Sequence, residues 1–316
     1  MPDGPPLGAL RVAARLSNAF TLDLVKLGAH GRDVIDPLIR TALLHANLAQ
    51  VMRDPDLMRR YATLDEDVPD EMRRPASINA IAASLRIPFE TARRRIGGLA
   101  EQGVCLITPA GVIVPHAATD TPFYRFACQV QFEKLHGLYD RLRAIGFLEA
   151  PPPLASAPYA GGEPPYRLAG RLVAQFVLRF TEPLAERIPD RVTQVALLDL
   201  ICANTEHLPD EEGGDDGVGP AGFVPDAQRK PVSIATLGDR LGVSHETMRR
   251  HVAELVELGL CRKAEHGFIV PAEALARPPF VRFLFDNQRH LVRMFSGLAD
   301  FGVLAAWDQT RRGAAA

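Results

Sequence analysis

The chain has 316 residues, of which 47% are hydrophobic and 23% are charged, and its formal net charge is −2. This length is enough for two domains of ordinary size, and the composition is typical of a soluble globular protein. No apolar run reaches the roughly 18 residues that a membrane span needs, and the first residues lack the basic and apolar segments of a signal peptide. We therefore expect a cytoplasmic protein rather than a membrane-spanning or secreted one.

The first half of the chain contains an ordered series of expected helices. Apolar periodicity predicts a helix over about 11–27 and a second over about 34–50, which Asp33 is placed to cap. A polar connection, two short helices and a β-wing follow. An amphipathic helix over about 121–146 ends this half of the chain.

A proline-rich stretch separates this series from a second one. Because proline fixes φ and removes a backbone donor, the stretch is expected to be a semi-rigid linker. The same order of elements then returns, with helices over about 168–186, 191–204 and 278–301. The expected arrangement is a first domain, a linker and a second domain, over residues 1–150, 151–166 and 167–316.

The two halves are related by an internal repeat. Residues 68–115 and 224–271 align at a constant offset of 156 without a gap, and 20 of their 48 positions are identical. Chance would give roughly three identities at ordinary residue frequencies. The repeat indicates a duplicated unit, so a single chain is expected to form a covalently joined pseudo-dimer with a pseudo-two-fold axis.

Each copy of the repeat contains a helix-turn-helix pattern followed by two short strands. In the second copy Ser233 suits a helix N-cap, Gly242 tolerates the positive φ of a turn, and Ser244 suits the cap of the next helix. The apolar positions of that next helix recur at helical spacing and predict its inward face, which consists of Met248, Val252 and Leu255.

This inward face leaves a polar group of side chains at the start of the second helix. Glu246, Thr247, Arg249 and Arg250 are expected to point sideways or outward. The first turns of a recognition helix are the part that contacts base edges in the major groove of DNA. Arginine can donate two hydrogen bonds to guanine, and glutamate can accept one from cytosine N4. An ordinary solvated helix face is the alternative for the arginines.

The segment Leu241–Leu260, L-G-V-S-H-E-T-M-R-R-H-V-A-E-L-V-E-L-G-L, resembles the recognition segment of bacterial winged helix-turn-helix transcription regulators. This resemblance implies a mainly α fold with small β-wings, in the form of two tandem winged helix-turn-helix domains. It also implies DNA contacts from both copies and from the second wing. The predicted DNA-binding residues are Glu90, Thr91, Arg93, Arg94, Arg95, Ser244, His245, Glu246, Thr247, Arg249, Arg250, Arg262 and Lys263.

The charge distribution supports this location. The stretches 73–106 and 229–263 carry +4 and +3, so the rest of the chain carries −9. The first copy nevertheless departs from the pattern, because Arg86 replaces the turn glycine and Pro88 replaces the capping serine. Its wing also carries no positive charge. We therefore expect unequal half-sites, with the second copy binding phosphate more strongly.

The sequence thus favours a sequence-specific transcription regulator that binds double-stranded DNA and acts with the transcription machinery at the nucleoid. Such a chain would act as a pseudo-dimeric monomer or as a weak homodimer. A tandem winged-helix adaptor that docks on proteins in a chromosome-associated complex is the alternative. No phosphate loop, nucleophile elbow or aligned metal-ligand set is present, so no enzyme, metal or cofactor is expected. An effector, if one exists, would bind between helices of the two copies near Phe123, Phe126, Phe280 or Phe283, although a plain core is the favoured role of these residues.

Overall fold

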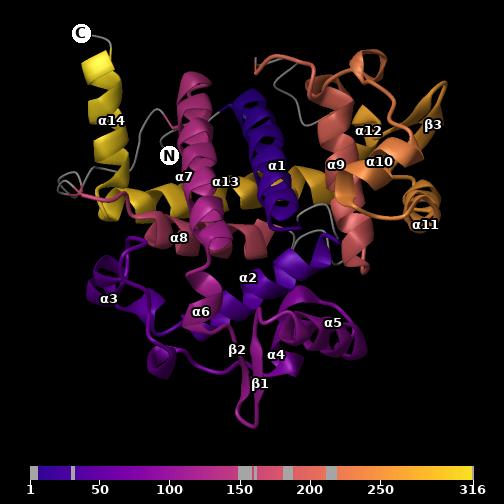
Figure 1. The fold of residues 1–316 in the computed structure, drawn as a ribbon. Helices are drawn as coiled ribbons and strands as arrows, with labels where there is room; N and C mark the ends of the chain where they lie inside the picture. Colours follow the sequence, from indigo (N-terminus) through magenta and orange to yellow (C-terminus); the bar gives the residue numbers. More distant parts are fainter. Residues whose placement is uncertain are drawn as a thin grey trace. The chain divides into compact units, whose positions relative to one another are not determined.

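The computed structural model describes residues 6–29, 33–148, 159, 162–180, 188–210 and 219–314. The fold is mainly helical, with two small antiparallel sheets of two strands each (Figure 1). The prediction of a mainly α protein with small β elements is confirmed. Most of the expected linker, residues 151–158, 160 and 161, lies outside the described residues.

The helices and strands of the first half follow the predicted order. The elements are α1 (Leu7–Ala29), α2 (Ile35–Asn47), α3 (Pro55–Arg60), α4 (Ile78–Leu85), α5 (Phe89–Glu101), β1 (Leu106–Thr108), β2 (Gly111–Ile113), α6 (His116–Thr119) and α7 (Pro122–Ala144). Asp33 accepts a hydrogen bond from the Ile35 N–H at 2.8 Å, as its predicted role at the start of α2 requires.

The second half has the same order of elements. They are α8 (Tyr166–Phe180), α9 (Arg191–Thr205), α10 (Ile234–Leu241), α11 (His245–Glu257), β3 (Arg262–Ala264), β4 (Gly267–Ile269), α12 (Ala272–Leu275), α13 (Pro278–Asp300) and α14 (Val303–Ala314). The predicted helices over 191–204 and 278–301 are confirmed. The predicted helix over 168–186 is described as far as Phe180, and residues 181–186 lie outside the described part.

The chain forms two compact units, and neither consists of one continuous stretch. Unit 1 contains Met1–Ile35, Gly137–Glu149 and Thr181–Arg289, whereas unit 2 contains Asp36–His136, Ala150–Phe180 and His290–Ala316. The first helix of each repeat therefore belongs to the unit that contains the α4–α5 or α10–α11 helix pair of the other repeat. We call this arrangement the exchange of first helices.

In unit 1, α1 packs on α9 from the other half of the sequence, and Figure 1 shows these helices side by side. The Asn18 amide donates to the Leu198 carbonyl at 2.9 Å, and Lys26 forms a 2.6 Å ion pair with the buried carboxylate of Asp199. Apolar side chains of α1, including those of Leu16 and Phe20, are buried. Burial of this face against α9 stabilises the exchanged position of α1.

In unit 2, α8 takes the corresponding place beside elements of the first half. The Arg167 N–H donates to the Ala62 carbonyl at 2.9 Å, and the rings of Tyr166 and Phe132 meet edge to face at 5.2 Å. Phe176 and Phe180 of α8 are among the largest fully buried side chains. Helix α1 thus packs an apolar face against elements of the second repeat, and α8 packs one against elements of the first repeat.

Candidate nucleic-acid interface

The predicted turn between the two helices of the second repeat is present. The Ser233 hydroxyl accepts from the Thr236 N–H at 3.1 Å at the start of α10, which ends at Gly242 with φ of 63°. The Ser244 hydroxyl then accepts from the Thr247 N–H at the start of α11. These caps and the left-handed glycine produce the sharp turn that the sequence predicts.

The first repeat makes the same turn with less suitable residues. Arg86 occupies the turn position with φ of 50° and is the one non-glycine residue with positive φ among the described residues. This conformation is unfavourable for a residue with a Cβ atom. Pro88 stands at the N-cap of α5 and supplies no side-chain hydrogen bond. The replacement of the turn glycine by Arg86 thus places a residue with a Cβ atom at positive φ.

The second helix of each pair has a buried face and an exposed face. Its buried residues are Ala92, Ile96 and Leu99 in α5 and Met248, Val252 and Leu255 in α11. Arg93, Arg94, Arg249 and Arg250 are exposed on both helices. The predicted inward face of α11 is therefore confirmed, and two adjacent arginines remain accessible to a partner in each repeat.

One arginine of each pair is held by a glutamate one turn earlier. Arg93 forms a 2.7 Å ion pair with Glu90, and Arg249 forms a 2.7 Å ion pair with Glu246. Hydrogen bonding to Arg249 lowers the pKa of the Glu246 carboxyl. Exposed pairs of this kind add little stability and rearrange easily, so phosphate or a base edge can compete for the guanidinium.

The position after the arginine pair has a different role. Arg95, which we predicted to bind DNA, is mostly buried, and its guanidinium lies 2.9 Å from the Asp36 carboxylate of α2. The equivalent residue, His251, is buried beside Thr193 of α9, at 2.8 Å between Nδ1 and the hydroxyl oxygen. Arg95 thus connects α5 to α2, and His251 connects α11 to α9.

Burial lowers the pKa of His251, and the positive charge of Arg250 adds to this effect against the opposing carboxylates of Asp190, Glu254 and Asp33. In the unfolded chain the ordinary histidine pKa is about 6.5. The unfolded chain therefore binds more protons than the folded one just below this pH, and acidification favours unfolding.

We expect the free energy of unfolding to fall as the pH is lowered from about 6.5, and to fall less steeply in His251→Asn. Urea unfolding at a series of pH values, followed by circular dichroism, measures both slopes. Equal slopes in the two proteins would contradict the buried neutral state of His251.

A hairpin follows each helix pair. Strand β1 pairs with β2 and β3 pairs with β4, both antiparallel, and one more residue before each helix pair bridges to the second strand. The buried Asn47 donates to the carbonyls of Arg74 and Val112 at 2.7 and 3.0 Å, and Asn204 makes the equivalent bonds to Lys230 and Phe268. Each asparagine thus ties its hairpin to the end of α2 or α9.

The two hairpins present different chemistry at their surfaces. Arg262 and Lys263 are exposed on β3, and Arg262 forms a 3.0 Å ion pair with Asp226. The equivalent residues on β1, Leu106 and Ile107, are apolar and are 52% and 54% exposed. The difference between the repeats that the sequence predicts is therefore located at the hairpin surface.

The remaining predicted site residues lie near the start of the second helices. Glu90, Ser244, His245 and Glu246 are exposed, while Thr91 and Thr247 are half-buried. Arg95 differs from these residues, because its guanidinium forms an ion pair with Asp36 of α2. The sequence missed the anchoring role of positions 95 and 251. Their place directly before the buried Ile96 and Val252 is the signal that could have shown it.

Comparisons with protein-family models, with curated proteins and with solved structures gave no match to this chain. In the part of the chain that the structure describes, every helix is too short or too polar to cross a lipid bilayer.

Proposed function

We propose that the chain is a sequence-specific regulator of transcription that binds double-stranded DNA through two winged helix-turn-helix heads. The first head is residues 76–114 and the second head is residues 232–270. In this proposal α5 and α11 enter the major groove, and the hairpins are wings that lie along the DNA backbone. The observation that carries the proposal is the pair of exposed arginines at the same place in both repeats.

Local charge supports nucleic acid as the partner. The stretches 73–106 and 229–263 are positive in a chain whose net charge is −2. Part of this charge is internal, because Arg73 and Arg229 are buried. The arginines on the exposed faces of α5 and α11, with Arg262 and Lys263, are available to phosphates and bases.

Alanine at Arg249 or Arg250 is expected to weaken binding to a selected DNA site by about 1–3 kcal/mol, or about 5- to 150-fold, if each side chain contacts a base. Fragments recovered from genomic DNA by the full chain supply the site, and gel-shift titrations give the affinities. Arg59→Ala is the matched control, because Arg59 is also 58% exposed and also forms an i,i+3 ion pair. Equal affinities of all three variants would remove Arg249 and Arg250 from the interface.

The proposal also implies two unequal half-sites. The second head offers Arg262 and Lys263 to phosphate, whereas the first hairpin offers exposed leucine and isoleucine. Footprinting of a selected site should therefore show one half protected at higher salt than the other, because each phosphate contact adds to the salt dependence of binding.

A second candidate function is that of an adaptor that docks on another protein through its first head. The exposed apolar side chains of Phe89, Leu106 and Ile107 favour this candidate. Salt separates the two possibilities, because DNA binding weakens steeply with ionic strength whereas docking of apolar side chains does not.

A further inference from the structure

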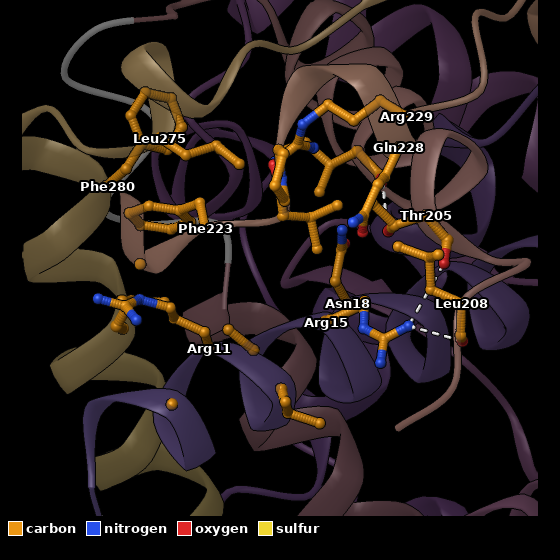
Figure 2. Close-up of a pocket in the computed structure, with 18 of the residues that line it drawn as sticks. Arg11, Arg15, Asn18, Thr205, Leu208, Phe223, Gln228, Arg229, Leu275 and Phe280 are labelled. Carbon is orange, nitrogen blue, oxygen red and sulfur yellow. Dashed lines mark hydrogen bonds between the residues drawn. The ribbon is translucent and has the colours of Figure 1, made fainter. Parts of the chain in front are cut away.

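Unit 1 contains a cavity of about 390 Å³ between α1, α9, α13 and the segment before α10. All of its described lining residues belong to unit 1. Figure 2 shows Phe223, Leu275 and Phe280 gathered on one side, with Asn18, Gln228 and Thr205 on the other. This volume and this mixture of apolar and polar groups are typical of a site for a small organic molecule.

The cavity wall carries a buried positive charge. The side chain of Arg229 is 1% exposed, and its Nη2 donates to the Val224 carbonyl at 2.9 Å. Its Nε and Nη1 have no hydrogen-bond partner among the described residues, although Nε lies 3.6 Å from the half-buried carboxylate of Asp226. Burial lowers the pKa of Arg229 to about 10. Donors left unsatisfied in a buried site are costly unless a ligand or water meets them.

The other polar groups of the wall add to this pattern. Arg11 and Arg15 also line the cavity, so three of the lining residues are arginines and none of those described is acidic. Arg11 stacks over the Phe223 ring at 4.9 Å, and Arg15 binds the carbonyls of Leu208 and Pro209 as well as Asp210. The wall therefore favours an anion over a cation.

Unit 2 differs from unit 1 in having a buried carboxylate beside the equivalent arginines. Its buried Asp67 lies 2.9 Å from the Arg73 guanidinium and 3.0 Å from that of Arg167. Thr119 donates to the same carboxylate, and Arg167 lies over the Tyr124 ring. One internal carboxylate is thus placed among the arginines of this unit.

The two clusters correspond position by position at the offset of the repeat. Each arginine of the unit 2 cluster has a counterpart in unit 1. Arg73, Arg167 and Arg171 of unit 2 correspond to Arg229, Arg11 and Arg15 of unit 1. The groups around the carboxylate differ, because Asp67, Thr119 and Tyr124 correspond to Phe223, Leu275 and Phe280. Unit 1 therefore has the same arginines, but apolar side chains that line a cavity stand where unit 2 has the internal carboxylate and its polar neighbours.

We propose that this cavity binds a small amphiphilic carboxylic acid, whose carboxylate faces Arg229 and whose apolar body contacts Phe223, Leu275 and Phe280. A single carboxylate matches the single aspartate of the equivalent cluster. The oxygen of the buried Asn18 amide has no hydrogen-bond partner among the described residues, so it is available to a ligand donor. This proposal goes beyond DNA binding and does not depend on it.

Isothermal titration calorimetry of the full chain tests the proposal with hexanoate, octanoate and phenylacetate as probes. We expect at least one acid to bind at one site per chain, because Asp67 already fills the equivalent place in unit 2. The amide of the same acid should bind at least about tenfold more weakly, since it cannot form a charge-assisted hydrogen bond. The absence of binding by all three acids would overturn the proposal, as would equal binding of acid and amide.

Two variants locate the site. Phe223→Asp places a carboxylate among the arginines of unit 1, as Asp67 does in unit 2, and is expected to reduce the affinity for the acid at least about tenfold. Phe126→Asp, at a position that is 54% exposed and outside the cavity, is the matched control and should bind as the parent does.

Arg229→Gln provides an independent test, because it removes the charge while keeping a side chain of similar length. This variant is expected to bind acid and amide with the same affinity. Circular dichroism establishes whether each variant is folded. If Phe223→Asp does not fold, Arg229→Gln alone tests whether the acid binds in this cavity. Retention of full acid affinity in a folded variant of either kind would show that the acid does not bind in this cavity.

Discussion

Replacement of Asp67 by asparagine is expected to lower the free energy of unfolding by about 3–5 kcal/mol, because it removes the nearest carboxylate from two buried guanidinium groups. The Asp67 side chain is 3% exposed and lies within 3.0 Å of the guanidinium groups of Arg73 and Arg167. Arg73 also donates to the carbonyls of Val68 and Val114 at 3.0 and 2.9 Å, so it has little freedom to turn towards solvent. Asparagine keeps the shape of the side chain but removes its charge.

Chemical unfolding of the full chain, followed by circular dichroism, measures this loss. Asp56→Asn is the matched control, since it makes the same substitution in an ion pair with Arg59 in which the Asp56 side chain is 93% exposed. We expect little change there, because exposed ion pairs contribute little to stability. Similar losses in the two variants would mean that Asp67 does not neutralise the buried arginines.

The second large effect concerns the exchange of first helices. A fragment of residues 1–158 and a fragment of residues 159–316 are each expected not to fold as a monomer, whereas an equimolar mixture should form a 1:1 complex with the helical content of the whole chain. In the first fragment α1 lacks α9, and in the second fragment α8 lacks Ala62 and Phe132. Apolar faces of helices of this length cannot be left in water without loss of the fold.

Light scattering after size exclusion gives the mass of each species, and thermal unfolding shows whether it is cooperative. The intact chain serves as the reference for helical content. A monomeric fragment that unfolds cooperatively would contradict the exchange of first helices, because such a fragment would have to bury the apolar face of its first helix against its own repeat.

Local features of the fold could be predicted because they depend on neighbouring residues. The caps at Ser233 and Ser244 and the positive φ at Arg86 follow from side-chain chemistry and backbone sterics within a few positions. The buried face of α11 follows from helical spacing. These features and the order of the elements therefore follow from the sequence of each repeat.

The exchange of first helices could not be predicted in the same way. Helices α1 and α8 are repeats of each other and share Arg15–Leu16 and Arg171–Leu172 at equivalent places. The apolar pattern of each helix is compatible with packing on either α2 or α9. Periodicity therefore predicts a buried face for α1 and α8 but not the helix against which that face packs. The choice depends on particular long-range contacts, such as Asn18 with Leu198 and Arg167 with Asp67.

The cavity was beyond sequence analysis for the same reason. Phe280 and Phe283 are among the residues that the sequence places near a possible effector, and both line the cavity. Phe126 instead is more than half exposed. The sequence places Arg229 in a positively charged stretch but does not show its burial, which depends on how α1 packs on the second repeat.

Covalent joining of the repeats also changes what a single mutation can do. In a homodimer every substitution is made in both subunits, so an aspartate that neutralises arginines across the interface cannot be lost from only one side. Here Asp67 and Phe223 are encoded separately, although they occupy equivalent places. One unit can therefore have an internal ion pair while the other has a cavity at the equivalent place. Identical subunits could not differ in this way.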